Sequence, residues 1–216
     1  MSNITNEDIT QFLDERYIQN DKGLYELRLQ CEELQIPIIQ RDVEMLLSSL
    51  LLLKRPKKIL EIGTAVGYSA MLMHKVSGAE IVTLEKMEDM VAKAEKNLID
   101  FGVEDNITIF HGDARKTIED IKHMKFDMVF IDGAKSHYLK FWKDINEFQM
   151  LDNSGVIFCD NVLMRGMTVD SKYDLNDRHR TNIRHMREFL DYIGEDTRYH
   201  TSILSVGDGV TISYKL

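Results

Sequence analysis

Oxygen-donor side chains stand directly after two apolar segments of the sequence. Asp132 follows the residues MVFI, and Asp160 and Asn161 follow VIFC. If these segments are neighbouring parallel strands, about 4.8 Å apart, the three side chains meet at one edge of a sheet. Two carboxylates and one amide are ligands that suit Mg²⁺ or another hard divalent cation. The alternative is that each side chain only caps the helix after its strand.

A glycine-bearing turn at residues 61–69, EIGTAVGYS, is typical of nucleotide-binding strand-to-helix turns. Ala65 replaces the glycine that admits a pyrophosphate in dinucleotide-binding loops. The carboxylate of Glu61 would repel a diphosphate but could help to hold an ammonium or another cation. Phosphate-rich ligands are therefore disfavoured. The alternative role of Gly63 and Gly67 is tight strand–helix packing alone.

Acidic residues after the next two apolar segments extend this site. Glu85 stands about 20 residues after the turn, the spacing at which a carboxylate accepts hydrogen bonds from ribose hydroxyls. The Asp113 carboxylate and the backbone N–H of Ala114 could bind the edge of an adenine. A ligand with adenine and ribose, without phosphate and with its own positive charge, is S-adenosylmethionine.

Lys135 follows Asp132 by three residues and is expected on the same rim. A divalent cation nearby would disfavour the ammonium and lower the pKa of the lysine toward that of a general base. The cation would chelate two neighbouring substrate oxygens, Lys135 would take a proton from one, and the oxyanion would attack the sulfonium methyl. The alternative is an ordinary solvated lysine.

Alternating strands and helices must position these residues. The short apolar segments KKILEIG, EIVTLE, NITIFHG, FDMVFIDG and SGVIFCDN alternate with amphipathic helical segments, as in βαβ units. The tail segments HTSILSV and GVTISYK, separated by Gly207-Asp208, predict an antiparallel hairpin. Residues 7–53 predict three helices, the last two separated by Pro37. The predicted fold class is α/β, a doubly wound, Rossmann-like mixed sheet that binds ligands at the carboxyl ends of its strands.

Length, charge and cysteine spacing limit the classes of protein to which the chain could belong. The chain of 216 residues predicts a single domain, with residues 1–53 as a helical cap and 54–216 as the cofactor-binding core. Its formal net charge of −9 argues against nucleic acid over most of the surface. Cys31 and Cys159 stand apart, so both are predicted to be reduced thiols without zinc. No signal segment or membrane-spanning run is visible, and we expect a cytoplasmic protein with no membrane partner.

From about Pro37 to its end, the chain resembles the metal-dependent O-methyltransferases of the catechol and caffeoyl-CoA type. The matching motifs are LEIGTAVGYSA, the acid Glu85, HGDA, FDMVFIDGAKSHY, FCDNVLMRG and VGDGVTIS. The resemblance implies the seven-stranded class I methyltransferase sheet and a homodimer. It also implies that S-adenosylmethionine is bound by Ile39, Gly63, Ser69, Glu85, Asp113, Ala114 and Asp132. The implied metal ligands are Asp132, Asp160 and Asn161. The implied catalytic residues are Lys135, as the base, and Asp132.

Within this family the chain is most similar to bacterial enzymes that methylate 5-hydroxyuridine at the tRNA wobble position. The segments IPIIQRD, KRPKKILEIGTA, DNVLMRG and an arginine-rich helix carry this resemblance. A 5-hydroxyuridine offers O5 and O4 as neighbouring oxygens, so it could chelate a metal as a catechol does. The resemblance therefore implies tRNA, at its anticodon, as the substrate.

Four arginines and no acid occupy residues 178–187, RHRTNIRHMR. We expect Arg178 and Arg180, together with Arg165, near the substrate entrance, where they would bind phosphates. The alternative for this segment is a solvated surface or a dimer contact. Two rival functions stay open at this point. One is an O-methyltransferase of small catechol-like phenols, and the other is a regulator that binds S-adenosylmethionine without turnover.

Overall fold

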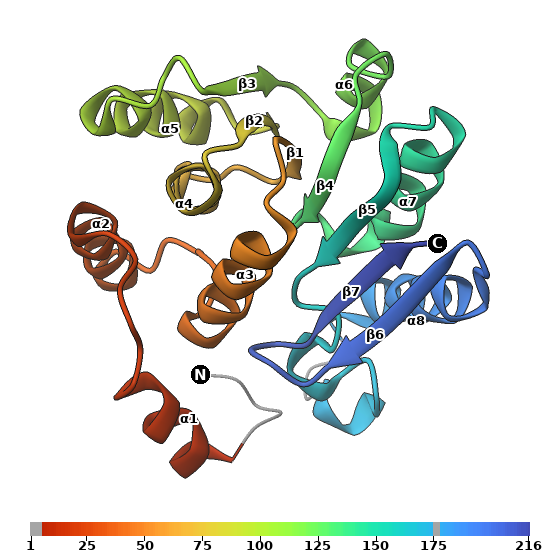
Figure 1. Cartoon of the computed structure of the whole chain (residues 1–216). Helices are drawn as coiled ribbons and strands as arrows, with labels where there is room; N and C mark the ends of the chain where they lie inside the picture. The colour runs from red at the N-terminus through yellow and green to blue at the C-terminus, as the bar shows by residue number, and fades with distance from the viewer. Residues whose placement is uncertain (1–5, 175–177) are drawn as a thin grey trace. The chain divides into compact units, whose positions relative to one another are not determined.

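The computed structural model describes residues 6–174 and 178–216. The chain divides into two compact units. The first, here called the N-terminal unit, is Tyr17–Ile121. The second, the C-terminal unit, is Lys122–Leu216 together with helix α1 (Glu7–Asp14). Figure 1 shows the elements of both.

The N-terminal unit contains three parallel strands and five helices. Its elements are α2 (Lys22–Glu33), α3 (Arg41–Lys54), β1 (Lys58–Ile62), α4 (Tyr68–Ser77), β2 (Glu80–Glu85), α5 (Glu88–Phe101), β3 (Ile107–His111) and α6 (Ala114–Asp120). The strands are ordered β3-β2-β1, and Ile62 pairs with Leu84 while Glu85 pairs with His111. The carboxyl ends of the three strands are therefore level.

The C-terminal unit contains a parallel pair of strands followed by an antiparallel hairpin. Besides α1, its elements are β4 (Phe126–Ile131), η1 (Lys135–His137), α7 (Tyr138–Glu147), β5 (Leu151–Cys159), η2 (Met164–Gly166), η3 (Ser171–Tyr173), α8 (Arg180–Glu195), β6 (Tyr199–Leu204) and β7 (Val210–Lys215). Strand β5 is parallel to β4 and antiparallel to β7, and β7 is antiparallel to β6. The seven strands have the order β3-β2-β1-β4-β5-β7-β6.

Aromatic side chains fill the space between α7, α8 and β6. The ring of Trp142 lies 4.6 Å from that of Tyr199 and 6.1 Å from that of Phe189, and Phe189 also meets Tyr138 edge-on at 5.6 Å. Trp142, Phe189 and Tyr138 are fully buried. Pairs of this kind add about 0.5–1.5 kcal/mol each beyond the burial of their area. They fix the helix that begins directly after η1, and η1 carries Lys135.

The predicted α/β fold class, the mixed sheet and the three N-terminal helices are confirmed. The C-terminal hairpin is also confirmed, but its connection spans residues 205–209 instead of the two residues that the sequence suggested. The turn closes at residue 209, where Gly209 N donates to Val206 O at 2.9 Å, so β7 starts later than expected. No helix in the described ranges is both long and apolar enough to span a membrane.

Candidate active site

The predicted cofactor turn lies between β1 and α4 in the N-terminal unit. Gly67 is the N-cap of α4 and has φ +83°, a conformation that side chains other than glycine rarely adopt. A Cβ at this position would also lie 3.4 Å from Cβ of Ala94 on α5. Gly63 N donates to Leu84 O at 3.0 Å, which continues the β1–β2 ladder past the end of β1. The turn thus needs glycine for its backbone path, and the space at position 67 leaves a Cβ only in close contact with Ala94.

Glu85, at the end of β2 as predicted, organises this turn through its carboxylate. Oε2 accepts from the backbone N–H groups of Thr64 at 3.2 Å and Ala65 at 2.9 Å. Oε1 accepts from the backbone N–H groups of Lys86 and Met87, each at 2.8 Å. An ionised carboxylate offers about four acceptor sites, so these four donors fill them. A ribose at Glu85 would therefore share or displace backbone donors, which the sequence did not suggest.

Ser69, on the first turn of α4, is held by the buried carboxylate of Glu61. The Ser69 hydroxyl donates to Glu61 Oε1 at 2.5 Å, and the Thr83 hydroxyl donates to Glu61 Oε2 at the same distance. Glu61 is fully buried, and Ser69 is 9% exposed. Glu61 thus fixes two hydroxyls from α4 and β2. The sequence suggested instead that it would face a cationic ligand.

Asp113 is the N-cap of α6, directly before Ala114. Its carboxylate accepts two hydrogen bonds from the Arg115 guanidinium and one from the Arg115 backbone N–H at 3.1 Å. The Arg115 side chain is the main cause that holds the pKa of Asp113 well below its ordinary value, and Lys86, with Nζ 3.3 Å away, acts in the same direction. The Asp113 side chain is 21% exposed, so one face of the carboxylate stays accessible.

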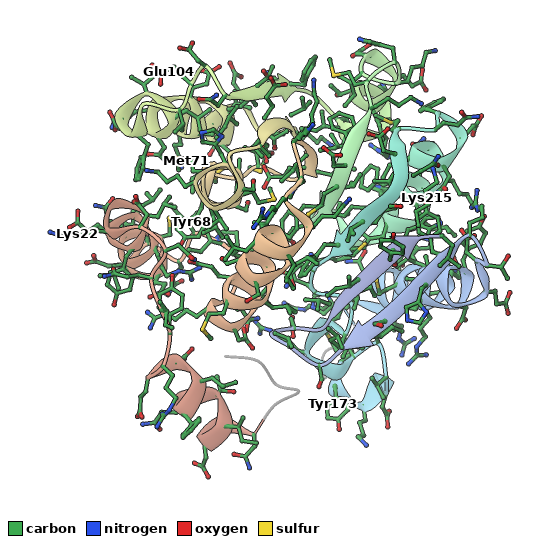
Figure 2. The ribbon with its side chains drawn as sticks, in the orientation of Figure 1. Lys22, Tyr68, Met71, Glu104, Tyr173 and Lys215 are labelled. Carbon is green, nitrogen blue, oxygen red and sulfur yellow. The ribbon has the colours of Figure 1, made fainter. Side chains whose placement is uncertain are left out.

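Ile39 is buried, and its carbonyl accepts from Arg28 Nη2 at 2.9 Å. Arg28 is the centre of an ionic network that sequence reasoning missed. The same nitrogen donates to Glu44 Oε2 at 2.5 Å, and Arg28 Nε donates to the Tyr68 hydroxyl at 3.1 Å. Tyr68 (labelled in Figure 2) donates in turn to Glu44 Oε2 at 2.7 Å, and Tyr17 donates to Glu44 Oε1 at 2.6 Å.

A signal for this network exists in the sequence. Arg28 lies between Leu24 and Cys31 at helical spacing, and all three are buried on one face of α2. A charged residue on an apolar helix face needs a buried partner of opposite charge. Burial and the Glu44 carboxylate raise the pKa of Tyr17 to about 12.

In the C-terminal unit, the predicted metal and base residues gather at the ends of β4 and β5. Ile131 pairs with Cys159, so Asp132 and Asp160 follow neighbouring positions of the sheet. Lys135 Nζ donates to Asp132 Oδ1 at 2.8 Å and to Asn161 Oδ1 at 2.7 Å. The structure therefore brings the predicted base into direct contact with two of the three predicted ligands.

Tyr138 completes this group and was not anticipated from the sequence. Its hydroxyl accepts from Lys135 Nζ at 3.0 Å and donates to the Asp160 carbonyl at 2.9 Å. Tyr138 follows Lys135 by three residues, as Lys135 follows Asp132, so the spacing DxxKxxY carried the signal. The hydroxyl joins the start of α7 to the end of β5.

The carboxylate of Asp160 is fully buried, and only one of its two oxygens has a hydrogen-bond partner among the described residues. Its Oδ1 accepts from Asn161 N at 2.6 Å, whereas Oδ2 has no hydrogen-bond partner among the described residues. Burial, and then the nearby carboxylate of Asp132, raise the pKa of Asp160 to about 8. A buried oxygen without a partner is costly, and a cation would satisfy it.

The donor set fits a hard divalent cation. It consists of the carboxylates of Asp132 and Asp160 and the amide of Asn161. Within residues 6–174 and 178–216 there is no group of three or more His, Cys, Asp or Glu side chains arranged to hold a metal. The third oxygen would therefore have to come from the amide, as the sequence predicted.

The pKa of Lys135 is shifted in the direction opposite to the one expected from the sequence. Burial favours the neutral amine, but the neighbouring Tyr138 and Asp132 outweigh it and raise the pKa above its ordinary value. The expectation of a lowered pKa assumed the charge of a divalent cation beside the amine. With Asp132 as its counter-ion, Lys135 is an ammonium that bridges two oxygen ligands.

The predicted phosphate-binding arginines are exposed, but their neighbours are not uniformly basic. Arg165 lies in η2, Arg178 precedes α8, and Arg180 is the first residue of α8. Arg184 pairs with Glu188 at 3.7 Å, and Arg187 Nε donates to the Thr168 carbonyl at 2.7 Å. An open hollow of about 610 Å³ beside α8 is lined by acids as well as arginines, among them Asp170, Asp174 and Asp191. The arginines of residues 178–187 therefore lie beside carboxylates that come both from later residues of α8 and from residues 170–174.

Known proteins were compared with the whole chain. The sequence model of the O-methyltransferase family matches residues 15–216. Catechol O-methyltransferase B of Danio rerio is 32% identical over 129 residues, which are 57% of this chain and 49% of that protein. The O-methyltransferase ankF of Aspergillus thermomutatus is 29% identical over 64% of this chain and 56% of its own length. The chain thus spans about half the length of these curated relatives.

Solved structures agree over nearly the full length. A Staphylococcus aureus protein assigned to the caffeoyl-CoA O-methyltransferases has a TM-score of 0.90 and 28% identity, covering 97% of this chain and 100% of its own. The methyltransferase PaMTH1 of Podospora anserina, bound to S-adenosylhomocysteine, has a TM-score of 0.85 and 28% identity, covering 98% of this chain and 97% of its own. The chain therefore belongs to the O-methyltransferase family.

Proposed function

We propose that the protein transfers a methyl group from S-adenosylmethionine to one of two neighbouring oxygens of its substrate, with a divalent cation such as Mg²⁺. The observation that carries this proposal is the group of Asp132, Lys135, Asn161 and Tyr138 beside Oδ2 of Asp160, which has no hydrogen-bond partner in the part of the chain that the structure describes. A cation site and a proton acceptor in contact are what deprotonation of a chelated hydroxyl requires. The product-bound relative from Podospora anserina supports the choice of cofactor.

The N-terminal unit is proposed to bind the cofactor. Gly63 allows the β1–α4 turn, Ser69 offers its hydroxyl oxygen, and Glu85 stands at the end of β2. Asp113 and the backbone of Ala114 would meet the adenine, and Ile39 would cover it with an apolar side chain. Asp132, in the C-terminal unit, is proposed to face the ammonium of the methionine part.

In this mechanism Asp132, Asp160 and Asn161 would hold the cation, which when bound would supply Lewis-acid stabilisation of a substrate oxyanion. Lys135 first gives a proton to solvent water and loosens its contact with Asp132, and the neutral amine then accepts the proton of the substrate hydroxyl. The substrate oxygen forms a bond to the methyl carbon while the carbon–sulfur bond breaks, and the sulfonium becomes a neutral thioether. Tyr138 keeps the amine of Lys135 in place through its hydroxyl.

The substrate we propose is 5-hydroxyuridine at the wobble position of tRNA, converted to 5-methoxyuridine. Its O5 and O4 are the required neighbouring oxygens, and the exposed Arg165, Arg178 and Arg180 would bind phosphates of the anticodon loop. The second candidate is a small catechol-like phenol, favoured by the identity with a catechol O-methyltransferase. Both substrates use the same ligands and the same base.

Methyl-labelled S-adenosylmethionine distinguishes these substrates. The protein is incubated with the cofactor, Mg²⁺ and either hypomodified tRNA or a panel of catechols. We expect label in 5-methoxyuridine, no label with Lys135→Met, and full label with the control Lys93→Met, an exposed lysine on α5. Label in catechols alone rejects the tRNA substrate, and cofactor binding without any transfer supports a regulator. Nucleoside mass spectrometry of tRNA from a strain without the protein tests the same proposal in cells.

A further inference from the structure

The closing motif VGDG is a turn that docks on the loop carrying Asn161. The turn is Val206–Gly209, directly before β7, and the loop is Asn161–Gly166, directly after β5. Val162 N donates to the Gly209 carbonyl at 2.8 Å, and Leu163 N donates to the Asp208 carbonyl at 2.9 Å. The loop is therefore bound to the turn along its backbone.

The side chain of Asp208 adds a third contact of the same kind. Its Oδ1 accepts from Arg165 N at 2.8 Å. Because the acceptor is a carboxylate, this hydrogen bond is stronger than one between neutral groups. Asp208 thus holds the loop at two points, one through its carbonyl and one through its side chain.

Gly209 lets the two segments approach each other this closely. It has φ +84°, and a Cβ at this position would lie 2.3 Å from Cγ and 2.6 Å from Cβ of Leu163. Any side chain would push Leu163 away or break the backbone contacts beside it. Position 209 therefore requires glycine for two reasons: the turn has a positive φ there, and the loop packs too closely for a Cβ.

The docked loop has a strained backbone. Asn161, Met164 and Arg165 have φ of +57°, +48° and +55°, values that residues other than glycine rarely adopt. Such a backbone conformation persists only where the surrounding structure fixes it. On one side, the Val206–Gly209 turn holds the loop in this conformation. On the other side the Thr168 hydroxyl donates to the Val162 carbonyl at 2.9 Å.

We propose that the Val206–Gly209 turn is a template that forces the loop onto this path, and that Asp208 and Gly209 are positioning residues for Asn161. The left-handed backbone at Asn161 directs its amide oxygen to Lys135 Nζ, while Arg165 four residues later is exposed. Without the template the loop would relax, and the amide would leave the group of oxygen ligands. The inference rests on the proposed function only where Asn161 is taken as a metal ligand.

Five variants of the full-length chain test the template. Asp208→Ala removes the side-chain acceptor, and Asp208→Asn keeps an oxygen that can accept from Arg165 N. Gly209→Ala drives a Cβ into Leu163. Gly209→Ala combined with Leu163→Ala removes Cγ and Cδ1 of Leu163, two of the three atoms that this Cβ would meet, and leaves its Cβ. Gly78→Ala is the matched control, because Gly78 has φ +73° but open space around its missing Cβ.

Three quantities are measured for each variant. They are the affinity for Mn²⁺ by electron paramagnetic resonance with S-adenosylhomocysteine bound, the affinity for S-adenosylhomocysteine, and the hydrogen exchange of the Leu163 and Arg165 amides. We expect Asp208→Ala and Gly209→Ala to weaken Mn²⁺ binding by roughly 10- to 100-fold, the usual effect of losing a group that orients a ligand, and to speed exchange. Asp208→Asn should recover most of both, the double variant should recover part of both because Cβ of residue 163 remains, and Gly78→Ala should change neither.

Unchanged Mn²⁺ affinity and unchanged exchange in Asp208→Ala overturn the inference. So does an equal loss of Mn²⁺ and S-adenosylhomocysteine affinity that Gly78→Ala reproduces, because that pattern is general destabilisation. If the unmodified protein binds no Mn²⁺, the metal in the proposed function fails. The amide exchange of Leu163 and Arg165 then decides on the template alone, with faster exchange in Asp208→Ala supporting it and unchanged exchange rejecting it.

Discussion

Lys135 holds three acceptors at once, and the proposed chemistry depends on releasing them. Its ammonium donates to Asp132, Asn161 and the Tyr138 hydroxyl. The raised pKa of Lys135 means that these contacts stabilise the charged form, which cannot accept a proton. A cation held by Asp132 and Asp160 would repel the ammonium and reverse this preference. In the proposed mechanism the same side chain is thus a counter-ion in one state and a base in the other.

Replacing Lys135 by methionine tests its proposed role as the base. Lys135→Met keeps the length of the side chain but removes the proton acceptor, so we expect methyl transfer to fall by about 10²- to 10⁴-fold. The affinity for S-adenosylhomocysteine, measured by calorimetry, should stay unchanged because the cofactor residues lie mainly in the N-terminal unit. An active Lys135→Met variant would remove Lys135 as the base. Loss of cofactor binding would instead show that the variant is misfolded.

At the scale of elements, a buried ion pair holds the helices of the N-terminal unit together. Arg28 of α2 and Glu44 of α3 are 2% and 1% exposed, and both contact Tyr68 at the start of α4. Arg28 also holds the Ile39 carbonyl between α2 and α3. The network therefore reaches both the predicted cover of the cofactor and the helix that follows the cofactor turn.

Breaking this pair is expected to be costly. Glu44→Ala leaves the Arg28 guanidinium buried without its carboxylate, which should lower the free energy of unfolding by about 3–5 kcal/mol in urea denaturation. Combining it with Arg28→Met should restore part of that loss, since no uncompensated charge remains. Glu26→Ala is the control, because its pair with Lys22 on α2 is exposed and should change stability by less than about 0.5 kcal/mol. Equal losses in Glu44→Ala and Glu26→Ala would contradict the role of the buried pair.

Asp196 connects α7, α8 and the segment before β6. Its Oδ2 accepts from Trp142 Nε1 at 3.0 Å and from Arg198 Nη2 at 2.7 Å. The Arg198 hydrogen bonds are the main cause that lowers the pKa of Asp196, with burial acting against them. A lowered folded-state pKa means that the charge stabilises the fold above the unfolded value of about 3.9 and that this contribution is lost as pH falls through the lower value.

The variant Asp196→Asn tests this pH dependence. We expect the unmodified protein to exceed it in free energy of unfolding by a constant amount above about pH 5, and the difference to shrink below about pH 4. Fluorescence of Trp142, the one tryptophan of the sequence, follows unfolding at the contact itself. Arg198→Met should remove the same contribution. A difference that persists or grows at pH 3 would reject this account.

The strand ends could be predicted from the sequence, whereas the contacts of the turns could not. Apolar segments ending in Asp132, Asp160 and Glu85 gave the correct strand ends, because burial on both faces produces continuous apolar runs and parallel strands end at one edge. The four backbone donors to Glu85 could not be predicted, because they depend on turn geometry. The contact between Asp208 and residues more than forty positions earlier could not be predicted from the sequence either, because it follows from the strand order β5-β7-β6.

At the scale of the whole molecule, the charge balance limits any contact with RNA. The chain has 27 basic and 36 acidic side chains, and a net charge of −9 repels phosphates over most of the surface. Arg184 and Arg187 already contact Glu188 and the Thr168 carbonyl. The side chains proposed to bind phosphates are the exposed Arg165, Arg178 and Arg180.

The salt dependence of tRNA binding measures how many phosphates this set binds. Replacing Arg165, Arg178 and Arg180 together by alanine should reduce the slope of log K against log salt concentration by roughly 2, because each phosphate contact on a single strand contributes about 0.7. The control replaces Lys54, Arg55 and Lys57 by alanine. It makes the same change in net charge just before β1, at the amino end of that strand.

Only contacts at particular phosphates would make these two variants differ. A diffuse attraction to the whole molecule would respond to net charge, so both variants would lose affinity equally and keep similar slopes. A reduced slope in the arginine variant alone would locate the RNA at the start of α8 and at η2. An unchanged slope in both would favour the small phenol as the substrate. A phenol needs no phosphate contacts, and the proposed ligands Asp132, Asp160 and Asn161 would serve it equally well.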